Sequence, residues 1–335
     1  MSRFPKSLKL FIPAVLLILS ALSCDNDTTE PPDYGDPPEI SKTFCDAEGI
    51  EVYLAYIAET YPALTDLREI GRSVDGRTLY VIEISDNPGT DEEEPAVFIG
   101  GGIHGHEQVS AGTAMHLLED LLEAYPDNPE AADIIDNYKL NIMPAINPDG
   151  LDDGNRYNSN GVDINRNFGF HWSESENYNG EEAFDQPESA ALRDDIIEEG
   201  YSSGLILHTA SFQSGIGIYG PWDSIPSDDE DFYTGNMDGA SYAVIESTGE
   251  AYSETLTATA GYPYSMHFHY EAGADWYILY GSVNDWALGV TGSVLYSVEL
   301  YGDQYFTTGD AVLLEEIWDR HKQSMLDFIR SNPEW

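Results

Sequence analysis

The stretch FIGGGIHGHEQ (residues 98–108) places two histidines and a glutamate directly after an apolar run and three glycines. The apolar residues from 96 to 103 have the composition of a buried β-strand. In a parallel sheet, ligand-binding side chains gather at the carboxyl ends of the strands. His104, His106 and Glu107 therefore stand where an α/β fold places a functional site. They could form a whole metal site, part of one, or a polar turn rich in histidine.

The sequence on both sides of this stretch alternates between strand-like and helix-like segments. Short apolar, β-rich segments predict strands at 78–85, 96–103, 139–146, 204–208, 215–220 and 293–300. Helical spacing of apolar residues predicts helices at about 47–60, 109–125, 187–199, 238–252 and 309–331. This alternation predicts an α/β domain with a largely parallel sheet buried on both faces. We see no internal repeat and no second linker, so residues 43–333 are predicted to form one domain.

The first 42 residues are expected to lie outside the fold. A basic start followed by the apolar run LFIPAVLLILSALS predicts a secretory signal over residues 1–23. The ending ALSC resembles the lipobox of bacterial lipoproteins, with ordinary cleavage and secretion as the alternative. The acidic, proline-rich residues 24–42, which begin with Cys24, are typical of a solvated tether. The chain is therefore expected to be exported and held by a lipid anchor in the periplasm or on the cell surface.

The charge balance excludes one large class of partners. The chain has 61 acidic against 14 basic residues, a formal net charge of −47. Such a surface repels phosphate backbones, so no nucleic acid is expected to bind. The surface also repels itself, which salt relieves. A saline habitat and a simple lineage bias both explain this composition. We expect a monomer whose only membrane contact is the lipid anchor.

Polar residues follow or end four different predicted strands: His104, the segment NPDG (147–150), His208 and Glu299. Their convergence on one edge of the sheet predicts an active site. Two histidine nitrogens, one carboxylate oxygen and an open position are the ligands of a catalytic zinc ion. His104, Glu107 and His208 could supply them.

His106 has two other interpretations. A His-x-His pair on a strand occurs in other metallohydrolases, but the further aspartate and histidine of those patterns are missing after Glu107. A zinc-binding HExxH helix needs a histidine at position 110, where this chain has Ser110. His106 is therefore interpreted as a wall residue of the site.

The order of the motifs carries a resemblance that no single motif carries. The segments HGHE, NPDG, RYNSNGVDINRNF, LILHTAS, DWYILYGSVNDW and YSVEL follow one another as in the zinc carboxypeptidases, the metallopeptidase family of the pancreatic and regulatory enzymes. The chain resembles this family from about residue 50 to about residue 331. The resemblance implies a mixed eight-stranded sheet flanked by helices and one Zn²⁺ ion on His104, Glu107 and His208. It also implies peptide substrates with a free C-terminal carboxylate.

The same resemblance assigns roles to residues around the metal. Asp163 would accept the other ring N–H of His104 and fix its tautomer. Arg156 would polarise the scissile carbonyl and stabilise the oxyanion. Asn165 and Arg166 would hold the terminal carboxylate of the substrate.

Further residues would act on the substrate. Glu299 would activate the water on the zinc as a general base and then protonate the leaving amine. Tyr277 would close over the substrate, with Tyr280 as the alternative. Asp223 could be the counterpart of an aspartate that selects C-terminal Lys or Arg in the regulatory branch, although the longer loop after His208 leaves that alignment open. Asn284 lies where the pocket floor is expected and indicates a polar pocket.

Three functions are therefore weighed. The leading one is a zinc carboxypeptidase that removes C-terminal residues from peptides outside the cytoplasm. The second is a peptidase for γ-glutamyl or diaminopimelate linkages in cell-wall peptides, on the same zinc site. The third is a non-catalytic binding lipoprotein, which would be expected to lack a zinc ligand or the base, and this chain has all of them.

Overall fold

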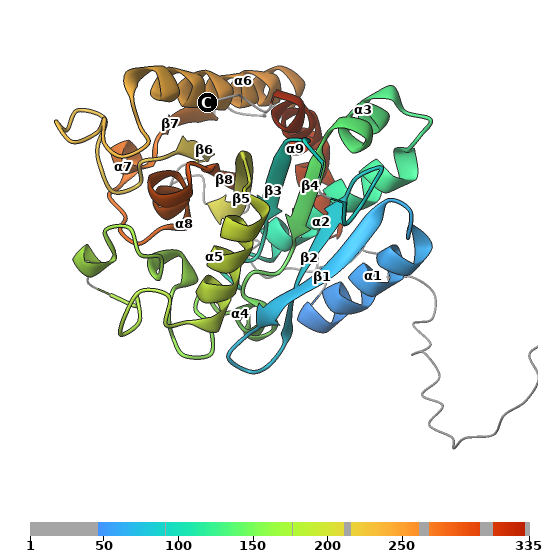
Figure 1. Ribbon diagram of the computed structural model, residues 1–335, viewed down its shortest axis with the longest axis horizontal. Coiled ribbons are helices and arrows are strands. Elements are labelled where there is room, and N and C mark those ends of the chain that lie inside the picture. The colour runs from blue at the N-terminus through green and yellow to red at the C-terminus, as the bar shows by residue number, and fades with distance from the viewer. Residues whose placement is uncertain are drawn as a thin grey trace, which may run out of the picture. The chain divides into compact units, whose positions relative to one another are not determined.

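A mixed sheet of eight strands organises the protein (Figure 1). The strands are β1 (Thr65–Arg72), β2 (Thr78–Ile84), β3 (Ala96–Gly100), β4 (Lys139–Met143), β5 (Ser203–Ala210), β6 (Gly217–Gly220), β7 (His269–Ala272) and β8 (Val294–Tyr301). Their order across the sheet is β1-β2-β4-β3-β5-β8-β6-β7. Strands β4, β3, β5 and β8 pair in parallel, whereas β2 and β6 run antiparallel to the neighbours that join them to this block. The predicted mixed α/β sheet is confirmed.

This computed structural model describes residues 46–90, 92–175, 177–210, 216–260, 268–301 and 311–331. The predicted signal segment, the tether and Cys24 lie outside the described residues. All the described residues belong to one compact unit. Within these ranges, no helix has both the length and the apolar character that a membrane span requires.

Helices cover both faces of the sheet (Figure 1). They are α1 (Ala47–Thr60), α2 (Gln108–Ala124), α3 (Pro129–Asn137), α4 (Pro148–Asp153), α5 (Pro187–Glu199), α6 (Gly239–Ala260), α7 (Gly273–Trp276), α8 (Val283–Trp286) and α9 (Ala311–Ser331). Successive strand residues point to opposite faces of the sheet, so each strand can contribute side chains to two hydrophobic cores. On β3, Val97 and Ile99 pack in the core under α1, α2, α6 and α9, whereas Phe98 packs in the core under α5 and α8. Burying one such side chain contributes about 1.5–3 kcal/mol.

The two predicted strands 96–103 and 139–146 end earlier than expected, at Gly100 and Met143. The last bond between these two strands is donated by the N–H of Gly101 to the carbonyl of Met143 at 2.9 Å, and beyond it the chain leaves the ladder. Both prediction windows were correct about burial but wrong about the strand ends. The residues beyond each strand turn into the loops that carry the candidate site.

The glycines of the opening stretch let two of these loops cross at close range. A Cβ atom on Gly101 would lie 2.7 Å from the carbonyl oxygen of Ser110. A Cβ atom on Gly105 would lie 1.9 Å from the carbonyl carbon of Gly150. No other residue fits at either place without moving the backbone. The run of glycines thus brings the histidine-bearing loop against the segment that follows β4.

Candidate metal and peptide site

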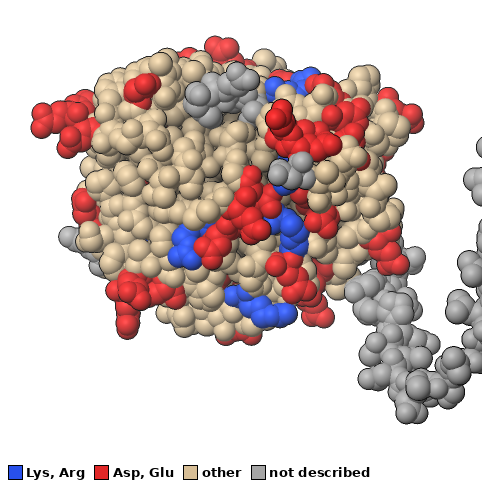
Figure 2. Space-filling model, in the orientation of Figure 1, with Lys and Arg blue, Asp and Glu red and all other residues tan. Residues whose placement is uncertain are grey.

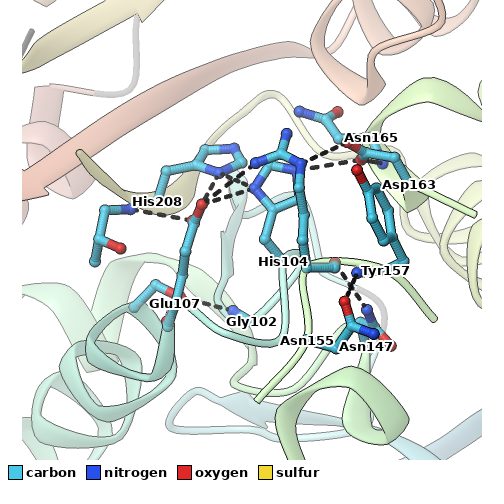
Figure 3. A network of polar contacts seen from close by, with 12 residues as sticks. Gly102, His104, Glu107, Asn147, Asn155, Tyr157, Asp163, Asn165 and His208 are labelled. Carbon is cyan, nitrogen blue, oxygen red and sulfur yellow. Dashed lines mark hydrogen bonds and ion pairs between the residues drawn. The ribbon is translucent and has the colours of Figure 1, made fainter. Parts of the chain in front are cut away.

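Three predicted metal ligands converge from different elements (Figure 3). His104 lies in the loop after β3, Glu107 directly precedes α2, and His208 lies on β5. The Nδ1 atom of His104 lies 2.9 Å from Oε1 of Glu107 and 3.2 Å from Nδ1 of His208. The Nδ1 atom of His208 lies 3.1 Å from the other oxygen of Glu107. All three side chains are buried, with 3–4% of each residue exposed.

This set of atoms fits a zinc ion. Ligand atoms about 2.0–2.1 Å from a zinc ion at tetrahedral angles lie roughly 3.3 Å from one another, close to the separations seen here. A neutral imidazole carries only one N–H, and Nε2 of His104 places it on Asp163 at 3.2 Å. The lone pair of Nδ1 in His104 then faces a carboxylate oxygen and a second imidazole nitrogen. These lone pairs repel one another, and a cation bound between the three atoms would turn the repulsion into attraction.

Asp163 connects the histidine to a guanidinium. One oxygen of Asp163 faces Nε2 of His104, and the other accepts from Nε of Arg156 at 2.9 Å. Although burial raises the pKa of Asp163, its interactions with His104, Arg156 and Arg166 hold it well below its usual range. Asp163 is therefore a carboxylate that fixes the ring of His104 and the side chain of Arg156 together.

Glu299 enters the site from β8. It pairs with His208 of β5 in the parallel register, so both side chains lie on the same face of the sheet. Burial and the negative charge of Glu107 raise the pKa of Glu299 well above its usual range. The structure thus brings a buried, proton-accepting carboxylate next to the three candidate ligands.

A cavity of about 420 Å³ opens over these residues. It is lined by His104, His106, Glu107, Arg156, Asn165, His208, Thr209, Ala210, Tyr219, Asp223, Gly273, Trp276, Tyr277, Leu279, Ser297 and Glu299. Eight of the eleven residues predicted for the site line this cavity. A ninth, Asp163, contacts two of the lining residues, His104 and Arg156. The exceptions are Arg166 and Asn284.

Arg166 and Asn284 are not among the residues that line the cavity. The guanidinium of Arg166 donates to the carbonyl of Asn165 at 3.0 Å. Its charge opposes the rise in the pKa of Asp223 and Tyr277, two residues that do line the cavity. Asn284 is fully buried, and its Nδ2 donates to the hydroxyl of Ser297 at 2.9 Å. Asn284 therefore reaches the cavity only through Ser297.

Asp223 is one member of a buried carboxyl pair. Its backbone N–H donates to Oδ1 of Asp285 at 2.6 Å, and the backbone N–H of Ser224 donates to the other oxygen at 2.9 Å. Burial raises the pKa of Asp223 to about 6, against the opposing effects of Ser282 and Arg166. Only Asp223 of the pair lines the cavity.

The sequence did not identify an aromatic cluster at the cavity. Tyr219 of β6 stacks on Trp276 with ring centroids 4.4 Å apart, and Trp276 packs edge-on against Tyr277 at 4.6 Å. Tyr277, the residue predicted to close over the substrate, is 43% exposed. The available signal was a lone aromatic residue among glycines, in GIGIYG directly before PWD.

Comparisons with known proteins agree with this geometry. The family model described as zinc carboxypeptidase matches residues 50–323. Carboxypeptidase B of Astacus astacus is 30% identical over 288 residues, which cover 77% of this chain and 86% of that protein. Carboxypeptidase A from Helicoverpa armigera has a similar fold, with a TM-score of 0.74 at 21% identity over 88% of this chain and 74% of the other.

Two other relatives are much longer than this chain. Carboxypeptidase SOL1 of Arabidopsis thaliana is 27% identical over 293 residues, which cover 88% of this chain but 57% of that protein. Carboxypeptidase D of Homo sapiens is 29% identical over 299 residues, which cover 84% of this chain but 20% of that protein. The likeness therefore concerns only part of each of these two proteins.

Proposed function

The chain belongs to the zinc carboxypeptidase family, and from this premise we propose that it is a metallocarboxypeptidase that removes C-terminal residues from peptides. The observation that carries the proposal is the meeting of His104, Glu107, His208 and Glu299 at one cavity. Three of these side chains offer a zinc donor set, and the fourth is a buried carboxylate free to exchange a proton.

The chemistry divides between a metal and the protein. Zinc held by His104, Glu107 and His208 would polarise a carbonyl and acidify water. The carboxylate of Glu299 accepts a proton from the attacking water and later gives that proton to the nitrogen of the leaving amine. A pKa raised by burial suits the second step, because the protonated carboxyl must survive until the C–N bond breaks.

Arginines balance the negative charge that the substrate brings. Arg156 lines the cavity with its Nε atom on Asp163 and its Nη1 atom 3.8 Å from Oε1 of Glu107, and its terminal N–H groups are proposed to donate to the oxyanion that develops on the scissile carbonyl. Asn165 and Arg166 are proposed to hold the C-terminal carboxylate. The Oδ1 atom of Asn165 already accepts from the N–H of Val283 at 3.0 Å, so its NH₂ group is the part left for a substrate.

Asp223 supports a preference for a cationic C-terminal residue. Among the described residues of the cavity wall, it is the one carboxyl group that neither belongs to the metal donor set nor is assigned to proton transfer. We therefore propose C-terminal Arg or Lys as the favoured leaving residue. The proposed place of action is outside the cytoplasm, which rests on the basic and apolar pattern of residues 1–23.

The test is a cleavage assay on a mixture of peptides that differ in their C-terminal residue. Zinc is supplied, and products are read by mass spectrometry. Stepwise loss of single C-terminal residues is expected, with Glu299→Gln slower by about 10²–10⁴-fold. Glu83→Gln is the matched control, since Glu83 is a buried strand glutamate outside the cavity that binds the N–H of Gly89. Intact peptides in the presence of bound zinc would contradict the proposal and favour the cell-wall linkages.

A further inference from the structure

Tyr219 is a buried residue of the cavity wall whose polar atom has no assigned task. Only 1% of the residue is exposed, and its side chain lines the cavity. In the part of the chain that the structure describes, the hydroxyl has no hydrogen-bond partner. Buried hydroxyls are usually paired, so the partner of this group is expected to come from outside the protein.

The register of the sheet places that hydroxyl beside the catalytic carboxylate. Gly217 of β6 lies opposite Glu299 of β8. The phenol of Tyr219 lies over Gly217, because a Cβ atom built there would stand 3.1 Å from both Cζ and Oη. Burial and the charge of Glu299 raise the pKa of Tyr219, so the group remains a neutral hydroxyl at working pH. A neutral hydroxyl can accept a hydrogen bond as well as donate one.

The ring is held in place independently of its hydroxyl. It stacks on Trp276 with an angle of 17° between the planes, and it meets His269 edge-on at 6.2 Å. Removing the oxygen therefore leaves the stack intact, which makes the function of the hydroxyl separable from the packing of the ring.

We propose that Tyr219 is a specificity-determining residue whose hydroxyl accepts an N–H from the guanidinium of a C-terminal arginine. This inference rests on the proposed function and deepens it. The cavity wall holds Asp223 and Glu299 as carboxyl groups besides the metal donor set, so a cation is the side chain that it attracts. A guanidinium has five N–H donors in a planar fork, enough to reach Asp223 and Tyr219 at once. The single ammonium of lysine spans two acceptors less well.

The experiment compares kcat/KM of the wild type and Tyr219→Phe on three peptides that differ only in a C-terminal Arg, Lys or Leu. We expect about a tenfold loss on the Arg peptide, mainly through KM, a smaller loss on the Lys peptide, and a change below twofold on the Leu peptide. Inhibition by free arginine should weaken by the same factor. Tyr270→Phe is the matched control, since its hydroxyl is also buried but lies outside this cavity.

Three outcomes would overturn the inference. One is an equal loss on all three peptides, which would show that the hydroxyl serves the architecture of the site. Another is an unchanged preference for arginine in Tyr219→Phe. The third is a wild type that prefers the Leu peptide, because Asp223 would then not attract a cation. A wild type that removes no residue from any of the peptides overturns the proposed function first, and the two failures are thus distinguishable.

Discussion

Two buried clusters of charged side chains differ in how their charges are balanced. In the first, Arg68 of β1 binds Asp195 of α5 at 2.7 Å and reaches Asn141 at 2.9 Å. Tyr201 donates its hydroxyl to the other oxygen of Asp195. The charges of Arg68 and Asp195 are therefore paired within the protein, although Nε of Arg68 has no partner among the described residues. On the face shown in Figure 2, the visible basic side chains likewise lie beside acidic ones.

The cavity is organised in the opposite way. Its acidic groups, which are Glu107, Asp163, Asp223 and Glu299, outnumber the nearby guanidiniums of Arg156 and Arg166. Burying a charge without a partner is costly, which is reflected in the raised pKa values of Asp223 and Glu299, and a cation that enters the cavity would offset this cost. The contrast indicates that the Arg68 cluster serves folding, whereas the cavity serves binding at the expense of stability.

The largest expected difference between the clusters is their response to zinc. At a free zinc concentration of about 1,000 times its Kd, the wild type should gain about 4 kcal/mol in the free energy of unfolding. Glu107→Gln removes a ligand and should gain almost nothing at the same concentration. Urea denaturation with zinc and with a chelator measures both values. Asp195→Asn is the control, and it should keep the full zinc increment. An equal increment in Glu107→Gln would contradict the assigned donor set.

A smaller effect is expected from the Arg68 cluster itself. Asp195→Asn should lower the free energy of unfolding by about 1–3 kcal/mol, because a charged hydrogen bond is lost in a buried setting. The loss is limited because Arg68 can also reach Glu199 at 3.2 Å. The kcat/KM on any cleaved peptide should stay within twofold of the wild type. A stable protein with impaired cleavage would mean that the two clusters are not separate.

The ends of helices and strands were not equally predictable from the sequence. The helix over 187–199 was predicted with its observed ends, since Pro187 begins it and Gly200 adopts a left-handed conformation after it. The strand windows ran too far because Ile103 and Ile146 are fully buried although they lie outside the ladder. Apolar pattern reports burial, and burial continues into loops that are covered on both sides.

The ligand trio was predictable because each member follows or ends a strand, and strand ends meet at one edge of the sheet. Tyr219 was not, because its place depends on the pairing of Gly217 with Glu299 across β6 and β8. Register is a tertiary property that local pattern does not encode. Arg166 and Asn284 do not line the cavity for a similar reason, since each sits in a short helical segment where one residue decides which side chain faces the cavity.

The smallest expected effect is a pH dependence of substrate preference. Burial raises the pKa of Asp223 to about 6, so the group is a carboxylate above that pH and a neutral acid below it. The attraction for a cationic residue should therefore weaken as the pH falls. The quantity to measure is the ratio of kcat/KM for an Arg peptide to that for a Leu peptide. This ratio should fall about tenfold between pH 7.5 and pH 5, in proportion to the ionised fraction.

Using a ratio removes the groups that act on both peptides alike. The ionisations of the metal site and of Glu299 change the two rates together and cancel. The groups that face Asp223 among the described residues are Asp285, Ser282, Arg166, Glu299 and Tyr277. In Asp223→Asn the ratio should be low and flat with pH. A ratio that still falls with pH in this variant would assign the titration to another group and remove Asp223 from the cation-binding side of the comparison.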